Sequence, residues 1–169
     1  MASTMILPQD LADKGFALFD VTKQADLIDY LFIKKCCYKN YVDEYYGGWF
    51  DDAAIKRSLE EFEKAMMQSC FKKIVLRNRT VGFFAFDEKE NCIDGVSIQI
   101  LEEAQGQGIG SFYLSHIVAL ANERNVPAFL QVFKANPAQK LYKRFGFEMR
   151  GETEPHYLME YRAAALHAR

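Results

Sequence analysis

The stretch Gln105-Gly106-Gln107-Gly108-Ile109-Gly110 decides how this sequence is interpreted, because of the segments on either side of it. Residues 96–100 before it alternate between apolar and polar side chains, which is typical of a β-strand. Apolar residues recur at helical spacing after it, from Ile109 to Leu120. A glycine-rich turn between a strand and a helix points several backbone N–H groups one way, and the helix dipole favours negative charge there. The stretch therefore predicts a phosphate-binding loop, although ordinary tight turns also show such glycine spacing.

The composition indicates one globular domain. The 169 residues are 50% apolar and 14% aromatic, which is enough to bury a sizeable core. The formal net charge of −2 argues against general binding to nucleic acid or anionic membranes. No apolar run approaches the roughly 20 residues that span a bilayer. We expect the domain to cover residues 1–162, with a tail over residues 163–169 whose Ala163-Ala164-Ala165-Leu166 is typical of a cloning-derived extension.

The cysteines indicate a reducing compartment. Cys36, Cys37, Cys70 and Cys92 show neither CxxC nor CxxH spacing, so we expect free thiols rather than disulfides or a metal site. Residues 1–5 also lack the charged and apolar segments of a signal peptide. The sequence therefore predicts a cytoplasmic protein without a metal requirement.

Hydrophobic periodicity predicts a specific order of strands and helices. Strands are expected over residues 16–21, 73–77, 80–86, 96–100, 128–133, 147–149 and 156–161. Helices are expected around the apolar stripes 27–32, 55–70 and 109–120 and over residues 137–145, while the tyrosine-rich residues 38–49 receive no element. The second of these helices carries Asp51-Asp52 at its start. The helix between strands 96–100 and 128–133 makes a crossover, so these two strands should be parallel. The order favours an α/β domain of the α+β type, with a mixed, mostly antiparallel central sheet of about seven strands and helices on both faces.

Two further segments combine with the glycine loop into a recognisable pattern. Residues 136–147, with the sequence NPAQKLYKRFGF, follow the loop, and Tyr157-Leu158-Met159-Glu160 has the pattern of a closing strand. Together with residues 98–110 they resemble the GNAT superfamily of N-acetyltransferases, whose motifs are Q/R-x-x-G-x-G/A and N-x-x-A-x-x-L-Y-x-x-x-G-F. The resemblance covers roughly residues 72–161. It implies the GNAT fold, in which the two parallel central strands splay apart.

The resemblance also implies acetyl-CoA as co-substrate, a primary amine of a small molecule or peptide as acceptor, and direct transfer in a ternary complex. The residues that it assigns to acetyl-CoA fall into two backbone groups, namely Ile98, Gln99 and Ile100 along the pantetheine arm and Gln105, Gly106, Gln107, Gly108, Ile109 and Gly110 at the pyrophosphate, with Ser111 behind them. A backbone N–H near Ile100 would polarise the thioester carbonyl. Asn136 matches a position that touches the pantetheine arm, but it also suits a helix cap, and both roles stay open.

Tyr142 is the candidate for chemistry. It matches the tyrosine of the second motif, where a phenol protonates the departing CoA thiolate, and the alternative is a core aromatic beside Leu141 and Phe145. Asp94 is the candidate general base, because many GNAT enzymes carry a carboxylate early in this strand. An ordinary Asp94-Gly95 turn explains the same residue equally well. Further titratable residues stay open as bases, namely His156, Asp43 and Glu44, whereas Glu102, Glu103 and His116 fit structural or solvated roles better.

The acceptor is expected to enter between the first two helices and the last strands. Aromatic and acidic residues gather in that part of the sequence, and Tyr41, Glu44, Tyr45 and Trp49 are the candidate substrate-binding residues. They suit a cationic amine through cation–π contacts and charge pairing, although a helix end packed by tyrosines explains them equally well. A polyamine, an aminoglycoside-like compound, an amino acid and a peptide amine all remain open.

Two other functions compete with an enzyme. A GNAT-fold module that binds acyl-CoA and regulates a partner is the alternative, but it would not require the thiolate acid Tyr142. A Rossmann or P-loop module would carry its glycine loop after the first strand, which this chain does not. Homodimers are frequent in the family, so a homodimer is a further expectation.

Overall fold

The computed structural model describes residues 5–166 of the chain. The elements of the N-terminal half are α1 (Gln9–Asp13), β1 (Phe16–Asp20), α2 (Lys23–Tyr46), α3 (Asp51–Met66), β2 (Cys70–Leu76), β3 (Arg79–Glu88) and β4 (Ile93–Ile100). Those that follow are the 3-10 turn η1 (Glu102–Ala104), α4 (Ile109–Arg124), β5 (Ala128–Phe133), α5 (Gln139–Arg144), β6 (Glu148–Glu152), β7 (His156–Tyr161) and the 3-10 turn η2 (Ala164–Leu166). All seven predicted strands are present, in the predicted order relative to the helices.

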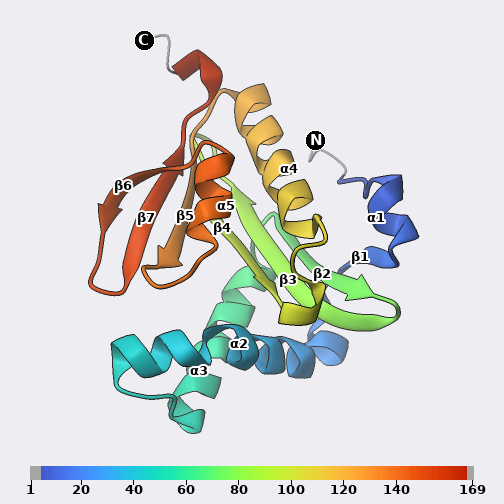
Figure 1. The fold of residues 1–169 in the computed structure, drawn as a ribbon, viewed down its shortest axis with the longest axis vertical. Coiled ribbons are helices and arrows are strands. Elements are labelled where there is room, and N and C mark those ends of the chain that lie inside the picture. Colours follow the sequence, from blue (N-terminus) through green and yellow to red (C-terminus); the bar gives the residue numbers. More distant parts are fainter. Residues whose placement is uncertain (1–4, 167–169) are drawn as a thin grey trace.

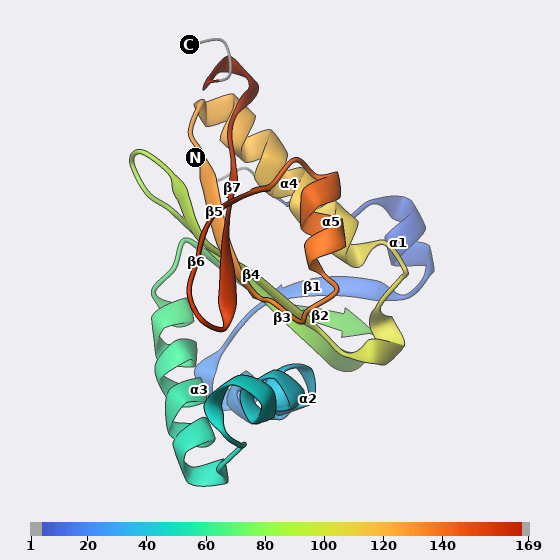
Figure 2. The ribbon, with the colours of Figure 1, turned by 60° about the vertical axis from the view of Figure 1, so that its left-hand side comes forward.

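The strands form one seven-stranded sheet in the order β1-β2-β3-β4-β5-β7-β6. Only β4 and β5 pair in parallel, and every other pair is antiparallel. Helices α2 and α3 cover one face of the sheet, and α4 and α5 cover the other (Figures 1 and 2). The predicted fold class, a mixed and mostly antiparallel sheet with helices on both faces, is therefore confirmed.

Each face of the sheet has its own hydrophobic core. Phe84, Tyr113, Ile117 and other residues form the core under α4, while Tyr30, Phe62 and Phe83 anchor the smaller core under α2 and α3. From Phe83 to Phe86, neighbouring residues of β3 alternate between the two cores, as the period of a strand requires. The sheet is thus buried from both sides in its centre.

The two parallel strands pair at one residue only. Ile93 faces Ala128, and the Ile93 N–H donates to the carbonyl of Pro127 at 2.9 Å. From Asp94 to Ile100, β4 pairs with β3 alone. The backbone edge of β4 that would face β5 is therefore open along most of the strand, as the resemblance implied.

The largest difference from the predicted elements concerns the tyrosine-rich residues 38–49. Helix α2 continues through them to Tyr46 and ends at Gly47, which has a φ of 76°. Tyrosine is only a moderate helix former, so this extension depends on tertiary packing described below. Helix α3 begins at Asp51, as Asp51-Asp52 indicated, but it ends at Met66, and Cys70 belongs to β2. The short α1 had no sequence signal that we identified.

The predicted tail is partly described. Ala163 is fully buried, and the backbone N–H of Ala164 donates to the Asn122 side chain at 3.0 Å. Residues 167–169 lie outside the described part of the chain, and the cloning origin of the tail stays a prediction. None of the helices in residues 5–166 has the length and apolarity needed to cross a bilayer.

Candidate active site

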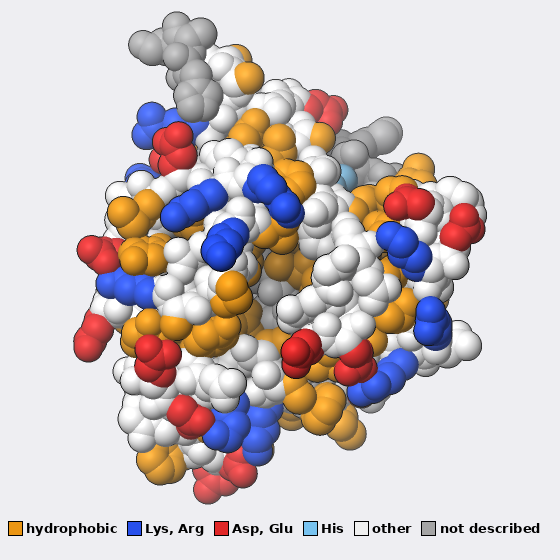
Figure 3. Space-filling model, in the orientation of Figure 1, with side chains coloured by type: hydrophobic (Ala, Val, Ile, Leu, Met, Phe, Trp, Pro, Cys, Tyr) orange, Lys and Arg blue, Asp and Glu red, His pale blue; other side chains and the backbone are white. Residues whose placement is uncertain are grey.

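One cleft of about 2440 Å³ passes through the opening between β4 and β5. At one end it is lined by the start of α4 and by α5, and on the other face of the sheet by α2, α3, β6 and β7. Figure 3 shows the hollow beside α5, with Lys and Arg side chains above it. Helix α5 carries Lys140, Lys143 and Arg144, and Arg144 lines the cleft. Positive charge therefore stands next to the glycine loop.

The glycine loop presents a row of free donors. Within residues 5–166, the backbone N–H groups from Gly106 to Ser111 donate no hydrogen bond to another group of the chain, whereas Phe112 donates to the Gly108 carbonyl. Gly106 and Gly108 have φ values of 71° and 101°, which L side chains rarely adopt. Six amides at the N-terminus of a 16-residue helix suit a diphosphate, because they supply donors and favourable dipole potential together. The loop thus fits the pyrophosphate of CoA.

The two glutamines of the loop stabilise it instead of extending into the cleft. The Gln105 side-chain amide donates to the Ile100 carbonyl at 2.9 Å, and that of Gln107 donates to the Glu103 carbonyl at 3.0 Å. Lys14, which follows α1, donates from its ammonium group to the Gln107 carbonyl at 3.0 Å. These bonds fix the loop to the end of β4.

The open edge of β4 offers backbone groups at Ile98 and Ile100. Leu101 donates to Val81 of β3 at 2.8 Å, so in this antiparallel ladder the groups of Ile98 and Ile100 point the opposite way, towards the opening. Accordingly the Ile100 carbonyl is bonded by the Gln105 side chain and by the Cys37 thiol at 3.6 Å. Burial raises the pKa of Cys37 to about 11, so this thiol is protonated and can donate.

Gln99 points to the other face of the sheet. Its side chain is only 7% exposed and hydrogen-bonds Tyr38 of α2. Burial raises the pKa of Tyr38, and this hydrogen bond opposes the shift. Gln99 thus connects the edge strand to α2 by its side chain while its backbone remains in the ladder with Phe83.

Tyr142 lines the cleft from α5. It is 7% exposed and its ring lies 6.3 Å from that of Phe147. Burial raises the pKa of Tyr142 well above its usual value, and the Tyr38 phenol on the other side of the opening adds to the shift. The phenol therefore keeps its proton throughout the neutral range, which a general acid requires.

Asn136 precedes α5 as a local cap. Its side-chain oxygen accepts from the Ala138 N–H at 2.9 Å, and the helix itself begins at Gln139, later than expected. Asn136 also lines the cleft. The capping role uses its oxygen and leaves its NH₂ group for a second partner.

Asp94 lies where β4 leaves β5. Its carboxylate pairs with Lys89 and accepts from the Gly95 N–H at 2.9 Å. The Lys89 hydrogen bond lowers the pKa of Asp94 more than partial burial raises it. Asp94 and Gly95 lie within β4, beside a register shift against β3 and with a φ of 62° at Gly95, and not in a connecting turn. The Asp94 carboxylate also lines the cleft.

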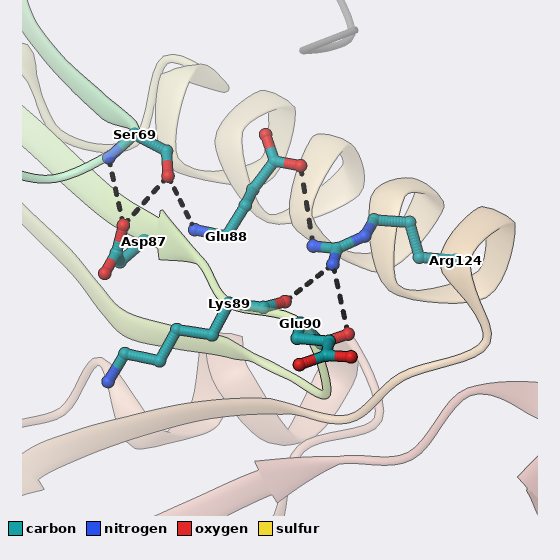
Figure 4. Close-up of polar contacts among 6 residues, drawn as sticks. All are labelled: Ser69, Asp87, Glu88, Lys89, Glu90 and Arg124. Carbon is teal, nitrogen blue, oxygen red and sulfur yellow. Dashed lines mark hydrogen bonds and ion pairs between the residues drawn. The ribbon is translucent and has the colours of Figure 1, made fainter.

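A polar network anchors the β3–β4 turn that carries Lys89 (Figure 4). Arg124, at the end of α4, donates to the carbonyls of Lys89 and Glu90 at 2.6 and 3.4 Å. On β3, the Asp87 carboxylate accepts from the N–H and the hydroxyl of Ser69, which precedes β2, at 3.1 and 2.8 Å. Bonds from two sides hold this turn, and hence the Asp94 backbone, in place.

The tyrosines of α2 surround Phe133 at the end of β5. Tyr41 and Tyr45 stack on the Phe133 ring with centroids at 5.1 and 6.0 Å, and the His156 ring lies 4.2 Å away. Burial lowers the pKa of His156, so its ring is neutral above pH 6.5. This aromatic cluster (Tyr38, Tyr41, Tyr45, Tyr46, Phe133 and His156) joins α2 to the C-terminal strands.

Two acidic side chains near the expected acceptor entrance form ion pairs and hydrogen bonds with neighbouring residues. Asp43 pairs with Lys39 and accepts from the Trp49 N–H at 2.7 Å. Asp51 pairs with Lys35 and accepts from the Trp49 indole at 3.0 Å. Of the four candidate substrate-binding residues, Tyr41 and Trp49 line the cleft, while Tyr45 stands behind Phe133 and Glu44 is outside the lining.

Other cleft residues were missed by the sequence reasoning. They are an ion pair beneath Tyr38, formed by Lys34 and Glu61, and three cations, Arg57, Lys64 and Arg150. The spacing of Arg57, Glu61 and Lys64 on one face of α3 was a usable signal, since these are neighbours on a helix. Arg150 had no such signal, because its ring partner Phe129 belongs to a distant strand.

No group of three or more His, Cys, Asp or Glu side chains gathers as a metal site would within residues 5–166. The absence of a metal requirement stays a prediction, because activity has to test it.

Solved structures of several known proteins share this fold. The structure of PH1933 from Pyrococcus horikoshii is 18% identical, with a TM-score of 0.67, and covers 87% of this chain and 98% of its own. The ribosomal-protein-S18-alanine N-acetyltransferase of Escherichia coli is 15% identical, with a TM-score of 0.63 and coverages of 87% and 93%. The PaiA N-acetyltransferase of Thermoplasma acidophilum, solved with coenzyme A, is 14% identical, with a TM-score of 0.62 and coverages of 87% and 98%.

A search of curated protein sequences finds no match. The sequence profile of the Acetyltransferase (GNAT) family matches residues 35–147, which include the glycine loop, Asn136 and Tyr142. This span is more than half of the chain. The chain therefore belongs to the GNAT family of acetyltransferases.

Proposed function

We propose that this chain is an acetyl-CoA-dependent N-acetyltransferase that acts on a primary amine of a small molecule or peptide by direct attack in a ternary complex. The observation that carries the proposal is the cleft through the β4–β5 opening, with free amides at one end and Tyr142 beside it. The similar structures support it, since one contains coenzyme A and another is an N-acetyltransferase of a protein alanine.

Acetyl-CoA supplies the acetyl thioester. The amides of residues 106–111 and the dipole of α4 hold its pyrophosphate, with Ser111 behind them. The backbone of β4 from Ile98 to Ile100 pairs with the pantetheine arm as an added strand would. The Ile100 N–H donates to the thioester carbonyl oxygen as negative charge develops there, and the free NH₂ group of Asn136 contacts the arm.

Proton transfers balance the reaction. The amine nitrogen forms a bond to the acetyl carbon, and the carbon–sulfur bond breaks. Tyr142 gives its phenolic proton to the departing sulfur, and the second proton that the nitrogen loses as the amide forms returns through water to the Tyr142 phenolate. Asp94 takes the proton that the ammonium loses before attack, directly or through water, because its lowered pKa keeps it ionised at neutral pH. On the acceptor side Tyr41 and Trp49, which line the cleft, contact the substrate. Tyr45, which stacks on Phe133, and Glu44 lie outside the lining and support them.

The substitution Tyr142→Phe tests the chemical assignment. We expect kcat to fall roughly 10²–10⁴-fold, measured as free thiol released from acetyl-CoA with a panel of amines. The dissociation constant for acetyl-CoA, measured by calorimetry, should stay close to that of the wild type. Tyr157→Phe is the matched control, because Tyr157 lies outside the cleft lining and its ring contacts Lys134.

The same assay separates an enzyme from a sensor. Binding of acetyl-CoA without thiol release from any amine would favour the regulatory module, and failure to bind acetyl-CoA would remove both. A cytoplasmic location is part of the proposal, supported by four cysteines that form no disulfide among the described residues.

A further inference from the structure

The part of the cleft on the α2 and α3 side carries excess positive charge. Glu102, Glu103 and Arg144 line the end of the cleft at the glycine loop and α5, and the other charged lining residues are Lys34, Arg57, Lys64, Lys89 and Arg150 against Glu61, Asp87 and Asp94. This is an excess of two positive charges, although the whole chain has a formal net charge of −2. His156 lines the same region and is neutral above pH 6.5, because burial lowers its pKa. The distribution is the reverse of the acidic entrance expected from the sequence.

Three of these cations have no carboxylate partner. Lys34 pairs with Glu61 and Lys89 pairs with Asp94. Arg57, Lys64 and Arg150 form no ion pair within residues 5–166, even though Lys64 is near enough to lower the pKa of Asp94. Their charge is therefore available to a ligand in the cleft.

Aromatic rings hold the two arginines in place. The guanidinium of Arg150 lies 4.9 Å from the centroid of Phe129, and that of Arg57 lies 5.2 Å from the centroid of Tyr46. A guanidinium over a ring keeps its N–H groups free at its edges. Such a fork is suited to a carboxylate, which accepts two parallel hydrogen bonds from it.

The cations come from two opposite walls. Arg57 and Lys64 belong to α3, whereas Arg150 belongs to β6. Phe129 and Phe133 alternate with the core residues Ala128, Leu130 and Val132 of β5, and Phe133 packs on α2. Arg150, which covers Phe129, thus lies on the same face as α3. A ligand that reaches the β4–β5 opening from this face passes between both walls.

We propose that the acceptor amine carries a carboxylate, which Arg150 binds from one wall while Arg57 and Lys64 attract it from the other. This inference rests on the proposed N-acetyltransferase function and narrows its acceptor. A polyamine is disfavoured, because its second ammonium would meet unpaired cations. The carboxylate belongs to a free amino acid or to an acidic peptide near its N-terminus, and the substrate panel distinguishes these two sources.

The first experiment compares matched acceptors at fixed, saturating acetyl-CoA. Free amino acids are paired with their primary amides, and tripeptides with glutamate at positions two and three are paired with lysine at those positions. We expect kcat/KM to favour the carboxylate of at least one pair about tenfold or more, which corresponds to about 1.4 kcal/mol. Preference in the first pair identifies an amino acid, and preference only in the second identifies an acidic peptide. Equal rates in both pairs overturn the inference.

The second experiment changes the arginine. Arg150→Gln should raise KM for the carboxylate acceptor about tenfold and leave kcat, the dissociation constant for acetyl-CoA and the amide acceptor unchanged. Arg150→Glu should reverse the preference towards the amide or the lysine peptide. Arg162→Gln is the control, since Arg162 is exposed, pairs with Glu160 and lies outside this cleft.

The two proposals fail in different ways. If no amine of the panel releases thiol, the N-acetyltransferase function is wrong. If amines are acetylated but Arg150→Gln and Arg150→Glu change no preference, only the carboxylate assignment is wrong. Circular dichroism and thermal unfolding of each variant confirm that a loss is not due to misfolding, because Arg150 is exposed and its replacement removes little buried contact.

Discussion

The two sides of the β4–β5 opening are built from different parts of the polypeptide. On the α4 side the groups proposed to bind acetyl-CoA are backbone amides of one short loop, and the glutamine side chains of that loop hold it to β4. On the α3 side the cleft is lined by side chains from α2, α3, β5, β6 and β7, which are proposed to bind the acceptor. A backbone site depends on conformation, whereas a side-chain site depends on which residues occupy distant positions.

The identity of the general base tests the difference between the two sides most sharply. Asp94 lies on β4, which is proposed to bind acetyl-CoA, whereas His156 lies on the acceptor side. We expect Asp94→Asn to lower kcat roughly 10²–10⁴-fold, since the variant cannot take the proton of the ammonium. The measurement is thiol release with both substrates saturating. Asp20→Asn, which removes a surface carboxylate paired with Lys72, is the matched control and should keep the wild-type rate.

The pH profile identifies the base if Asp94 is not responsible. The pKa of Asp94 is lowered from 3.8, so its ionisation produces no change in rate between pH 5 and 8. His156 has its pKa lowered from 6.5, so a base at this position would give a rate that rises with pH below 6.5. A rising limb that disappears in His156→Gln, together with a normal rate for Asp94→Asn, would move the base to the acceptor side.

The next effect concerns the aromatic cluster that joins the two sides. Phe133→Ala removes the ring on which Tyr41 and Tyr45 stack, and we expect a loss of about 3–5 kcal/mol in the free energy of unfolding. Urea denaturation measures it. Phe133→Leu fills more of the space and should cost less. In the leucine variant, KM for the acceptor should rise while the dissociation constant for acetyl-CoA stays constant, and a change in the latter instead would contradict the division.

The local geometry of the proposed cofactor side could be predicted from the sequence for a physical reason, although the role of its residues towards acetyl-CoA stays a proposal. A strand, a glycine-rich turn and a helix within about 20 residues fix the direction of the amides, whatever the rest of the fold does. Gly106 and Gly108 adopt the positive φ angles that only such residues tolerate well. Asn136 caps its own segment, and Tyr142 follows it at fixed spacing in the same motif. Local geometry was sufficient in each case.

The acceptor side was not readable, because its contacts join distant parts of the chain. The extension of α2 to Tyr46 packs against the Phe133 ring, which comes much later in the sequence. The predicted role of the local acids also assumed that they face a ligand, whereas Asp43 and Asp51 are engaged by Lys39, Lys35 and Trp49. No pattern in the sequence predicts that the Arg150 guanidinium lies over the Phe129 ring.

A smaller effect tests whether the cofactor side is truly a backbone site. A Cβ at Gly82 would lie 2.4 Å from the Gln99 carbonyl oxygen and 3.3 Å from the Ile100 Cα, so Gly82→Ala must displace β4. We expect about 1–3 kcal/mol of destabilisation and weaker binding of acetyl-CoA by calorimetry. Gly151→Ala is the control, since its Cβ would meet only Leu158 at 3.8 Å. Gln107→Ala, which removes a side chain but no amide, should weaken acetyl-CoA less than Gly82→Ala, and the opposite order would contradict a backbone site.

The smallest effect separates two histidines, one on each side of the sheet. His116 lies on α4 with its ring 6.0 Å from Phe86, and His156 lies beside Phe133. Burial lowers the pKa of both rings from 6.5, so below that pH the unfolded chain takes up protons more readily than the folded one. The free energy of unfolding should therefore be constant between pH 7 and 8 and fall as the pH drops below 6.5.

Urea denaturation at a series of pH values measures this decrease for the wild type, His116→Gln and His156→Gln. Each variant should lose part of the pH dependence, because glutamine does not titrate in this range. The two should differ in activity, since His116 does not line the cleft, whereas His156 stands in the wall that the acceptor passes. If His116→Gln changed KM for the acceptor as much as His156→Gln, the two sides of the sheet would be coupled through the core, and a division into independent sites would not hold.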